Sequence, residues 1–121
     1  MPRRRPGTLF PLELDILDSG IVLQSQEGSF YGFLLAKHLS AGGGDALIAH
    51  GTLYKALSRM TEAGLIEADW EDPAFAEQEG RPRRRLYRVT GEGEVARMRE
   101  HQRLAEEQRS AAVRIPGASP A

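Results

Sequence analysis

The chain has 121 residues, a length that favours one compact domain with short appendages. Hydrophobic residues make up 40% of it and charged residues 27%, which is typical of a globular protein and too apolar for wholesale disorder. The absence of cysteine excludes disulfides, thiolate metal sites and cysteine nucleophiles. We expect a cytoplasmic protein without a signal peptide, a transmembrane helix or a cofactor.

The formal net charge of -1 would, taken alone, argue against binding to nucleic acid. The distribution of charge indicates the opposite, because the arginines gather at residues 3–5 and 81–88 and acidic residues fill the region between 62 and 79. The first cluster (Arg3, Arg4, Arg5) is either a flexible arm that attracts phosphate or a solubilising tail, and we assign it no site.

Apolar residues recur at three- and four-residue steps in the first part of the chain and predict a helix from about Pro11 to Gln24. Ser29 can cap a second helix, which the glycines at 42–44 end. Leu53, Leu57 and Met60 mark the core face of a third helix that starts near His50, and Gly64 can end it in the left-handed conformation. Three short, closely connected helices are typical of a helix-turn-helix.

From Leu65 onward the apolar residues alternate with acidic ones, which predicts a strand ending at Trp70. Residues 72–82 are polar and predict a hairpin loop, and residues 86–89 form the return strand. Two strands with a basic-ended loop after three helices predict a wing. We expect the Trp70 side chain to cover the core; stacking on a flat ligand is the minority interpretation.

Thr90 can cap a fourth helix that runs to about Arg114. This helix is thinly apolar and cannot bury itself alone, so we expect it to pack on the first helix and on a second copy of the chain. The predicted dimer interface consists of Leu12, Ile16, Val95, Met98, Gln102 and Ala105.

Three segments in this order resemble the PadR family of transcriptional regulators: Gly-Ser-Phe-Tyr-Gly-Phe-Leu-Leu at 28–35, the segment 51–66 that begins Gly-Thr-Leu-Tyr, and Gly-Arg-Pro-Arg-Arg-Arg-Leu-Tyr at 80–87 with its continuation to 93. The resemblance implies a mainly α fold with a small β-hairpin, a winged helix-turn-helix with a C-terminal dimerisation helix. Residues 8–90 would form the DNA-binding domain and 91–115 the dimerisation helix, with 1–7 and 116–121 as flexible tails. It also implies that the third helix enters the major groove of DNA.

The candidate DNA-binding residues lie on the exposed side of the third helix, at the start of the second and in the wing. They are Tyr31, His50, Thr52, Tyr54, Lys55, Arg59, Arg81, Arg83, Arg84 and Arg85. Other interpretations stay open: Tyr31 as a buried aromatic residue, Tyr54 packed on the second helix, and Lys55 and Arg59 on a solvated face.

We therefore expect a sequence-specific repressor that binds an inverted-repeat operator as a homodimer, with a small-molecule effector as one mode of regulation. An enzyme is disfavoured because His38, His50 and His101 lie on separate helices, without metal-ligand or triad spacing, and because 42–44 lacks the rest of a phosphate-binding loop. The main alternative is a winged-helix module that docks on another protein.

Overall fold

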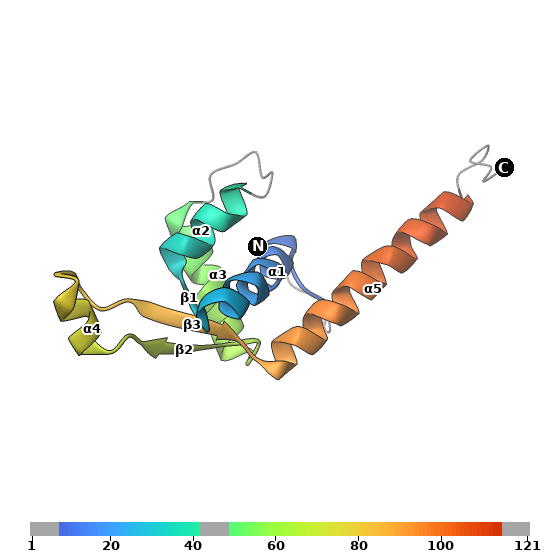
Figure 1. Ribbon diagram of the computed structural model, residues 1–121. Helices are drawn as coiled ribbons and strands as arrows, with labels where there is room; N and C mark the ends of the chain where they lie inside the picture. Colours follow the sequence, from blue (N-terminus) through green and yellow to red (C-terminus); the bar gives the residue numbers. More distant parts are fainter. Residues whose placement is uncertain (1–7, 42–48, 115–121) are drawn as a thin grey trace.

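The computed structural model describes residues 8–41 and 49–114, and places a small sheet and a long C-terminal helix around a helical centre (Figure 1). In chain order its elements are α1 (Pro11–Glu27), β1 (Phe30–Tyr31), α2 (Gly32–Ala41), α3 (His50–Glu62), β2 (Ile66–Trp70), α4 (Pro73–Gln78), β3 (Arg85–Val89) and α5 (Gly91–Arg114). The tails expected at 1–7 and 116–121 and the glycines at 42–44 lie outside the described residues.

The first helix begins and ends on recognisable signals. Pro11 occupies its first turn, where a missing N–H leaves no bond unmade, and the Glu13 carboxylate accepts a hydrogen bond from the Phe10 N–H at 2.8 Å. Gly28 ends it in the left-handed conformation, with φ 87°. The helix therefore continues three residues beyond the predicted end at Gln24.

The core lies between α1, α2, α3 and the inner face of the sheet. Leu53, Leu57 and Met60 are buried in it, as the spacing in α3 predicts, and Gly64 follows that helix with φ 79°. The three predicted helices are confirmed, and α3 turns the predicted side toward the core.

The sheet contains the predicted hairpin and one further strand. Its order is β1-β3-β2 and both pairings are antiparallel, with Ile66 opposite Val89 and Trp70 opposite Arg85. The prediction that Ser29 caps the second helix is wrong, because the residues after it pair with β3 and α2 begins only at Gly32. Backbone pairing with a strand more than fifty residues away overrides the local capping signal.

The segment predicted as a hairpin loop contains the short helix α4, which corrects that expectation. Asp72 caps it, its side chain accepting a hydrogen bond from the Ala74 N–H at 2.9 Å, and Pro73 occupies the first position. We call residues 66–89, with β2, α4 and β3, the wing.

The wing and α5 extend in different directions from the helical centre, with α4 at the far end of the wing (Figure 1). Thr90 caps α5 as predicted: its hydroxyl accepts from the Gly93 N–H at 3.0 Å and donates to the Gly64 carbonyl at 2.6 Å. Among the helices of the described chain, none combines the length and apolar character needed to cross a bilayer. The mainly α fold with a small sheet, a winged helix-turn-helix, is confirmed.

Candidate nucleic-acid interface

The side of α3 opposite its core face is open to solvent. His50, Thr52, Tyr54 and Lys55 are all exposed there, in the first two turns of the helix. Their imidazole, hydroxyl and ammonium groups offer hydrogen-bond donors and acceptors, and positions at the start of a recognition helix are those that reach base edges.

Tyr54 is held in place by two neighbours. Its ring lies 4.8 Å from the ring of His50, and the hydroxyl end lies directly over Gly32, where a Cβ atom would overlap the hydroxyl and stand 2.7 Å from Cζ. The absence of a side chain at Gly32 therefore allows α2 and α3 to approach closely at this point. Tyr54 packs on α2, as one of its two interpretations expects, and still exposes 36% of its surface.

Arg59 contacts α1, whereas Tyr54 contacts α2. Its Nε donates to Oε2 of Glu13 at 3.0 Å, and its guanidinium lies 5.3 Å from the centre of the Phe10 ring. The carboxylate of Glu13 is fully buried, whereas the Arg59 side chain is 42% exposed. Arg59 thus joins α3 to α1, which reduces its availability for DNA.

A second ion pair joins the residues on either side of α4, Glu71 and Arg81. Arg81 donates from both terminal nitrogens to the two carboxylate oxygens of Glu71, at 2.6 and 2.9 Å, and the Arg84 N–H also donates to Glu71 at 3.3 Å. The side-chain hydrogen bonds from Arg81, aided by the Arg84 N–H, hold the pKa of Glu71 at about 2, against an ordinary value of 4.5. Arg81 is a structural clamp within the wing and not an open cation.

The three arginines that follow are arranged differently. The guanidinium of Arg84 lies 4.1 Å from the centre of the Tyr31 ring, and those of Arg83 and Arg85 lie 5.4 and 5.1 Å from the ring of Trp70. Stacking on an aromatic face leaves the N–H edge of a guanidinium free to donate. Such groups suit the phosphates of a nucleic acid.

These side chains line an open groove between the wing and the ends of α2 and α3, with a volume of about 410 Å³. We call it the wing groove; its lining residues are Tyr31, Gly32, Phe33, Tyr54, Trp70, Arg83, Arg84 and Arg85. It brings together the predicted wing arginines and the start of the third helix.

Ion pairing distinguishes three arginines of the wing from several others in the described chain. Those with a carboxylate partner are Arg59, Arg81, Arg88, Arg97 and Arg103. Within residues 8–41 and 49–114, Arg83, Arg84 and Arg85 have no carboxylate within ion-pairing distance. These three guanidiniums lie close together at the wing groove and give it a local positive charge.

Comparison with known proteins identifies the class of molecule that carries this surface. Residues 21–99 match the model of the transcriptional regulator PadR-like family. The chain belongs to the PadR-like family of transcriptional regulators. This family consists of DNA-binding regulators and not enzymes.

Solved structures agree with the family match. A transcriptional regulator from Clostridium thermocellum, 22% identical over 86% of this chain and 92% of its own, has the same fold with a TM-score of 0.66. PadR family regulators from Clostridium difficile and Eggerthella lenta are 26% and 28% identical, with TM-scores of 0.61 and 0.56. They cover 80% and 84% of this chain and 92% and 86% of their own. A search of curated proteins gave no match.

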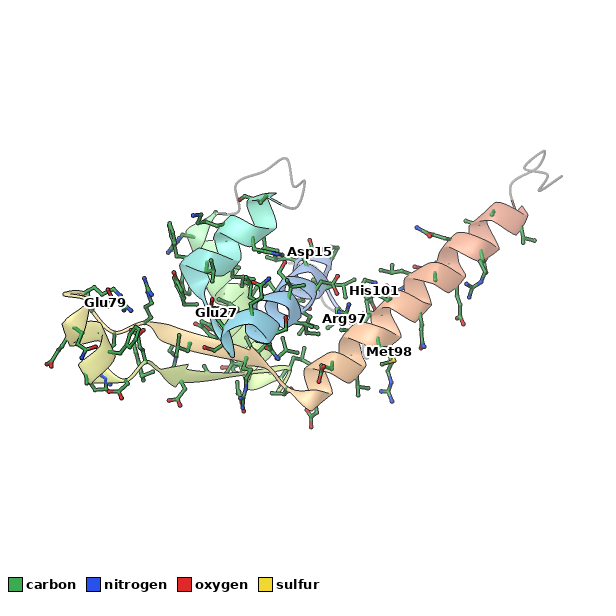
Figure 2. All side chains as sticks on the ribbon, viewed as in Figure 1. Asp15, Glu27, Glu79, Arg97, Met98 and His101 are labelled. Atoms are coloured by element: carbon green, nitrogen blue, oxygen red, sulfur yellow. The ribbon has the colours of Figure 1, made fainter. Side chains whose placement is uncertain are left out.

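In this PadR-like chain, the helix α5 presents an outward face that the other described residues leave exposed. Val95 and Met98 are exposed, Gln102 is exposed and Ala105 is half-buried. Figure 2 shows Met98 on the side of α5 away from α1. We call Val95, Met98, Gln102 and Ala105 the outer face of α5.

The opposite side of α5 contacts α1 through charged groups. Arg97 and His101 both reach the carboxylate of Asp18, His101 Nε2 at 2.9 Å, and Figure 2 shows both side chains directed toward α1. Burial and the nearby charge of Asp18 raise the pKa of Asp15, on the same helix.

Of the two residues of α1 predicted for the dimer interface, one lies in the core. Ile16 has no exposed surface and belongs to the core of its own chain, so its assignment to a dimer interface is wrong. Leu12 is half-buried against the same core. An apolar stripe in a helix does not distinguish a residue that contacts the chain's own core from one that contacts a partner.

Two further side chains are placed differently from the sequence-based expectation, and a third was not expected at the site. Tyr31 lies in β1 and not in a helix, half-buried beneath Arg84. Trp70 does not cover the core but is 52% exposed in the wing groove, since β2 extends beyond the helices. Phe33, not singled out from the sequence, is exposed on the same groove; its place after the Tyr-Gly pair was the available signal.

Proposed function

We propose that this PadR-like chain is a sequence-specific repressor that binds an inverted-repeat operator as a homodimer. In each subunit the start of α3 enters the major groove, with His50, Thr52, Tyr54 and Lys55 toward the bases and the adjacent backbone. The wing follows the neighbouring phosphates and places its free arginines along them.

One observation carries this proposal: Arg83, Arg84 and Arg85 are stacked on aromatic rings and not paired with carboxylates, and they lie beside the exposed face of α3. A bare surface arginine loses side-chain entropy when it is ordered on a phosphate. Arginines already ordered on rings lose less side-chain entropy when they bind.

The outer face of α5 supports the homodimer. Met98 is 58% exposed and Val95 46% exposed, although the spacing of Val95, Met98, Gln102 and Ala105 follows a three-four repeat. A second α5 packed in antiparallel or crossed fashion would bury these side chains and present two α3 helices to one face of the duplex.

The test compares two kinds of arginine within the wing. The double variant Arg84→Ala/Arg85→Ala removes two unpaired guanidiniums, whereas Arg88→Ala, the control, removes one that is paired with Glu67 at 2.6 Å. Binding to the duplex upstream of the chain's own gene is measured by fluorescence anisotropy over a range of KCl concentrations. Each lost phosphate contact lowers the slope of log K against log salt by about 0.9, so the double variant should lose about 2 and the control little.

The same experiment distinguishes the protein-docking alternative. If the wild-type chain binds duplex DNA no better than the double variant, at any salt concentration, a winged-helix module that docks on another protein becomes the better account. Footprinting of the upstream DNA then checks for a protected inverted repeat, and a reporter gene checks that occupancy lowers transcription.

Regulation by a small molecule is part of the proposal, since two thinly apolar α5 helices can leave space between the subunits. A ligand there would change the separation of the two α3 helices. Thermal-shift screening identifies candidates, and a compound that stabilises the dimer without changing DNA affinity contradicts the switch.

A further inference from the structure

We propose that Trp70 is itself a DNA-binding residue: its indole holds Arg83 and Arg85 in position and contacts the sugar-phosphate strand that lies in the wing groove. This inference rests on the proposed function and adds to it an aromatic residue from the β2 side of the wing. The ligand is one strand of duplex DNA, contacted without regard to base sequence.

The position of Trp70 follows from the register of the hairpin. It is the last residue of β2 and lies opposite Arg85, so the two side chains project from the same face of the sheet. Further back along β2, that face is the one that carries the buried residue Ile66. At Trp70 the helices no longer cover the face, and the indole is 52% exposed in the wing groove.

The indole lies close to two guanidiniums and contributes to their arrangement. Arg83 and Arg85 carry like charges and both lie within 5.4 Å of the same ring centre. The negative face of an aromatic ring offsets the repulsion between neighbouring cations and restricts their rotamers. The indole therefore presents a pair of ordered donors to the groove.

The apolar part of the groove indicates a contact that arginines alone would not need. Phe33, from the start of α2, is 62% exposed, and Tyr54 lines the groove from α3. A groove with aromatic walls and free guanidiniums matches a deoxyribose-phosphate strand, in which apolar sugar surface alternates with charged phosphate. A purely electrostatic clamp would not require exposed rings.

The chain contains one tryptophan, so its fluorescence reports on this position alone. A mixed-sequence duplex of about 30 base pairs is titrated into the full-length protein in about 50 mM KCl, with anisotropy of the labelled duplex as the independent measure of binding. We expect the emission of Trp70 to be quenched and shifted to shorter wavelength as the duplex binds, and acrylamide to quench it less in the complex.

Two variants test the contribution of the ring to affinity. Trp70→Ala should weaken binding at least about fivefold, and Trp70→Phe, which keeps an aromatic face, should weaken it less. The control is Phe75→Ala: Phe75 is also 52% exposed in the wing and also lies near an arginine, Arg81, but it is on α4, outside the groove. Its removal should leave affinity unchanged, and melting temperatures check that all variants fold.

The outcomes separate this inference from the function it rests on. Normal anisotropy binding with unchanged Trp70 emission, unchanged acrylamide quenching and a Trp70→Ala variant that binds like wild type would overturn the role of Trp70 and leave DNA binding intact. No binding of the duplex by the wild-type protein would overturn both.

Discussion

Glu13 of α1 and Arg59 of α3 form an ion pair across the helical centre, with Arg59 Nε donating to the fully buried carboxylate at 3.0 Å. The pair joins the first helix to the helix proposed to read DNA. Since the carboxylate is the buried member, the two partners are not equivalent: a lost Arg59 takes a charged hydrogen-bond donor from a buried carboxylate, whereas a lost Glu13 leaves a guanidinium that water can reach.

Replacement of Arg59 by alanine is therefore expected to lower the free energy of unfolding by roughly 1.5–3 kcal/mol, the usual cost of losing a hydrogen bond to a charged group. The slope of DNA affinity against salt should stay unchanged, because Arg59 is occupied by Glu13. Urea denaturation and a salt series of anisotropy titrations measure the two effects.

Lys55→Gln is the matched control on the same helix, since Lys55 is exposed and has no carboxylate partner among the residues that the structure describes. It should change stability by less than about 0.5 kcal/mol and lower the salt slope by about 0.9. The reverse pattern, a stable Arg59→Ala protein with a reduced slope, would place Arg59 on the DNA.

Gly32→Ala is expected to displace Tyr54 from its position on α2, because the added methyl group would overlap the Tyr54 hydroxyl. Overpacking of this kind costs about 1–3 kcal/mol, and the displaced ring should also weaken DNA binding. Thermal melts and anisotropy titrations measure both. Gly91→Ala, at a position with no atom within 4 Å of the added carbon, should do neither; equal effects of the two substitutions would contradict the close approach of α2 and α3.

Met98→Glu is expected to separate the proposed dimer, since it places a charge on the outer face of α5 and two such charges would meet across the interface. Light scattering after size-exclusion chromatography gives the mass of the species in solution. The control Gln78→Glu adds the same charge on α4, at the far end of the wing, and should leave the mass unchanged. A Met98→Glu protein of unchanged mass would place the dimer contact elsewhere.

The pH dependence of the wing should follow Glu71. Its pKa is lowered to about 2 in the folded chain, so its contribution to stability is fully present above its ordinary pKa of 4.5 and is lost as the pH falls toward 2. The melting temperatures of wild type and Glu71→Gln should therefore differ at neutral pH and converge below pH 4.5. Carboxyl ¹³C chemical shifts measure the titration directly, and a Glu71 midpoint near 4.5 would rule out the clamp by Arg81.

Much of the helical framework was predictable because its signals are local. The three-four spacing of Leu53, Leu57 and Met60 identifies the buried side of α3, and Thr90 lies at the cap of α5 in both sequence and structure. The motifs around Gly-Thr-Leu-Tyr were sufficient to indicate the family.

The differences arise where distant contacts decide the outcome. Trp70 lies on the same face of its strand as the buried Ile66, but the sequence does not show that the covering helices stop before it is reached. Glu13 reads as an ordinary acidic residue of a helix start, and a single sequence does not show that Arg59 lies against it. The helix α4 could have been predicted, because Asp72 and Pro73 form a signal for the start of a helix. The polar residues around them favoured a loop instead.

The first helix carries both Glu13, which holds α3, and Asp18, which holds Arg97 and His101 of α5. A rotation of α5 would therefore be transmitted to α1 and α3 through these ion pairs. In the proposed dimer, substitutions in α5 alone would therefore change the distance between the two operator halves that bind best, without any change to the side chains proposed to contact each half.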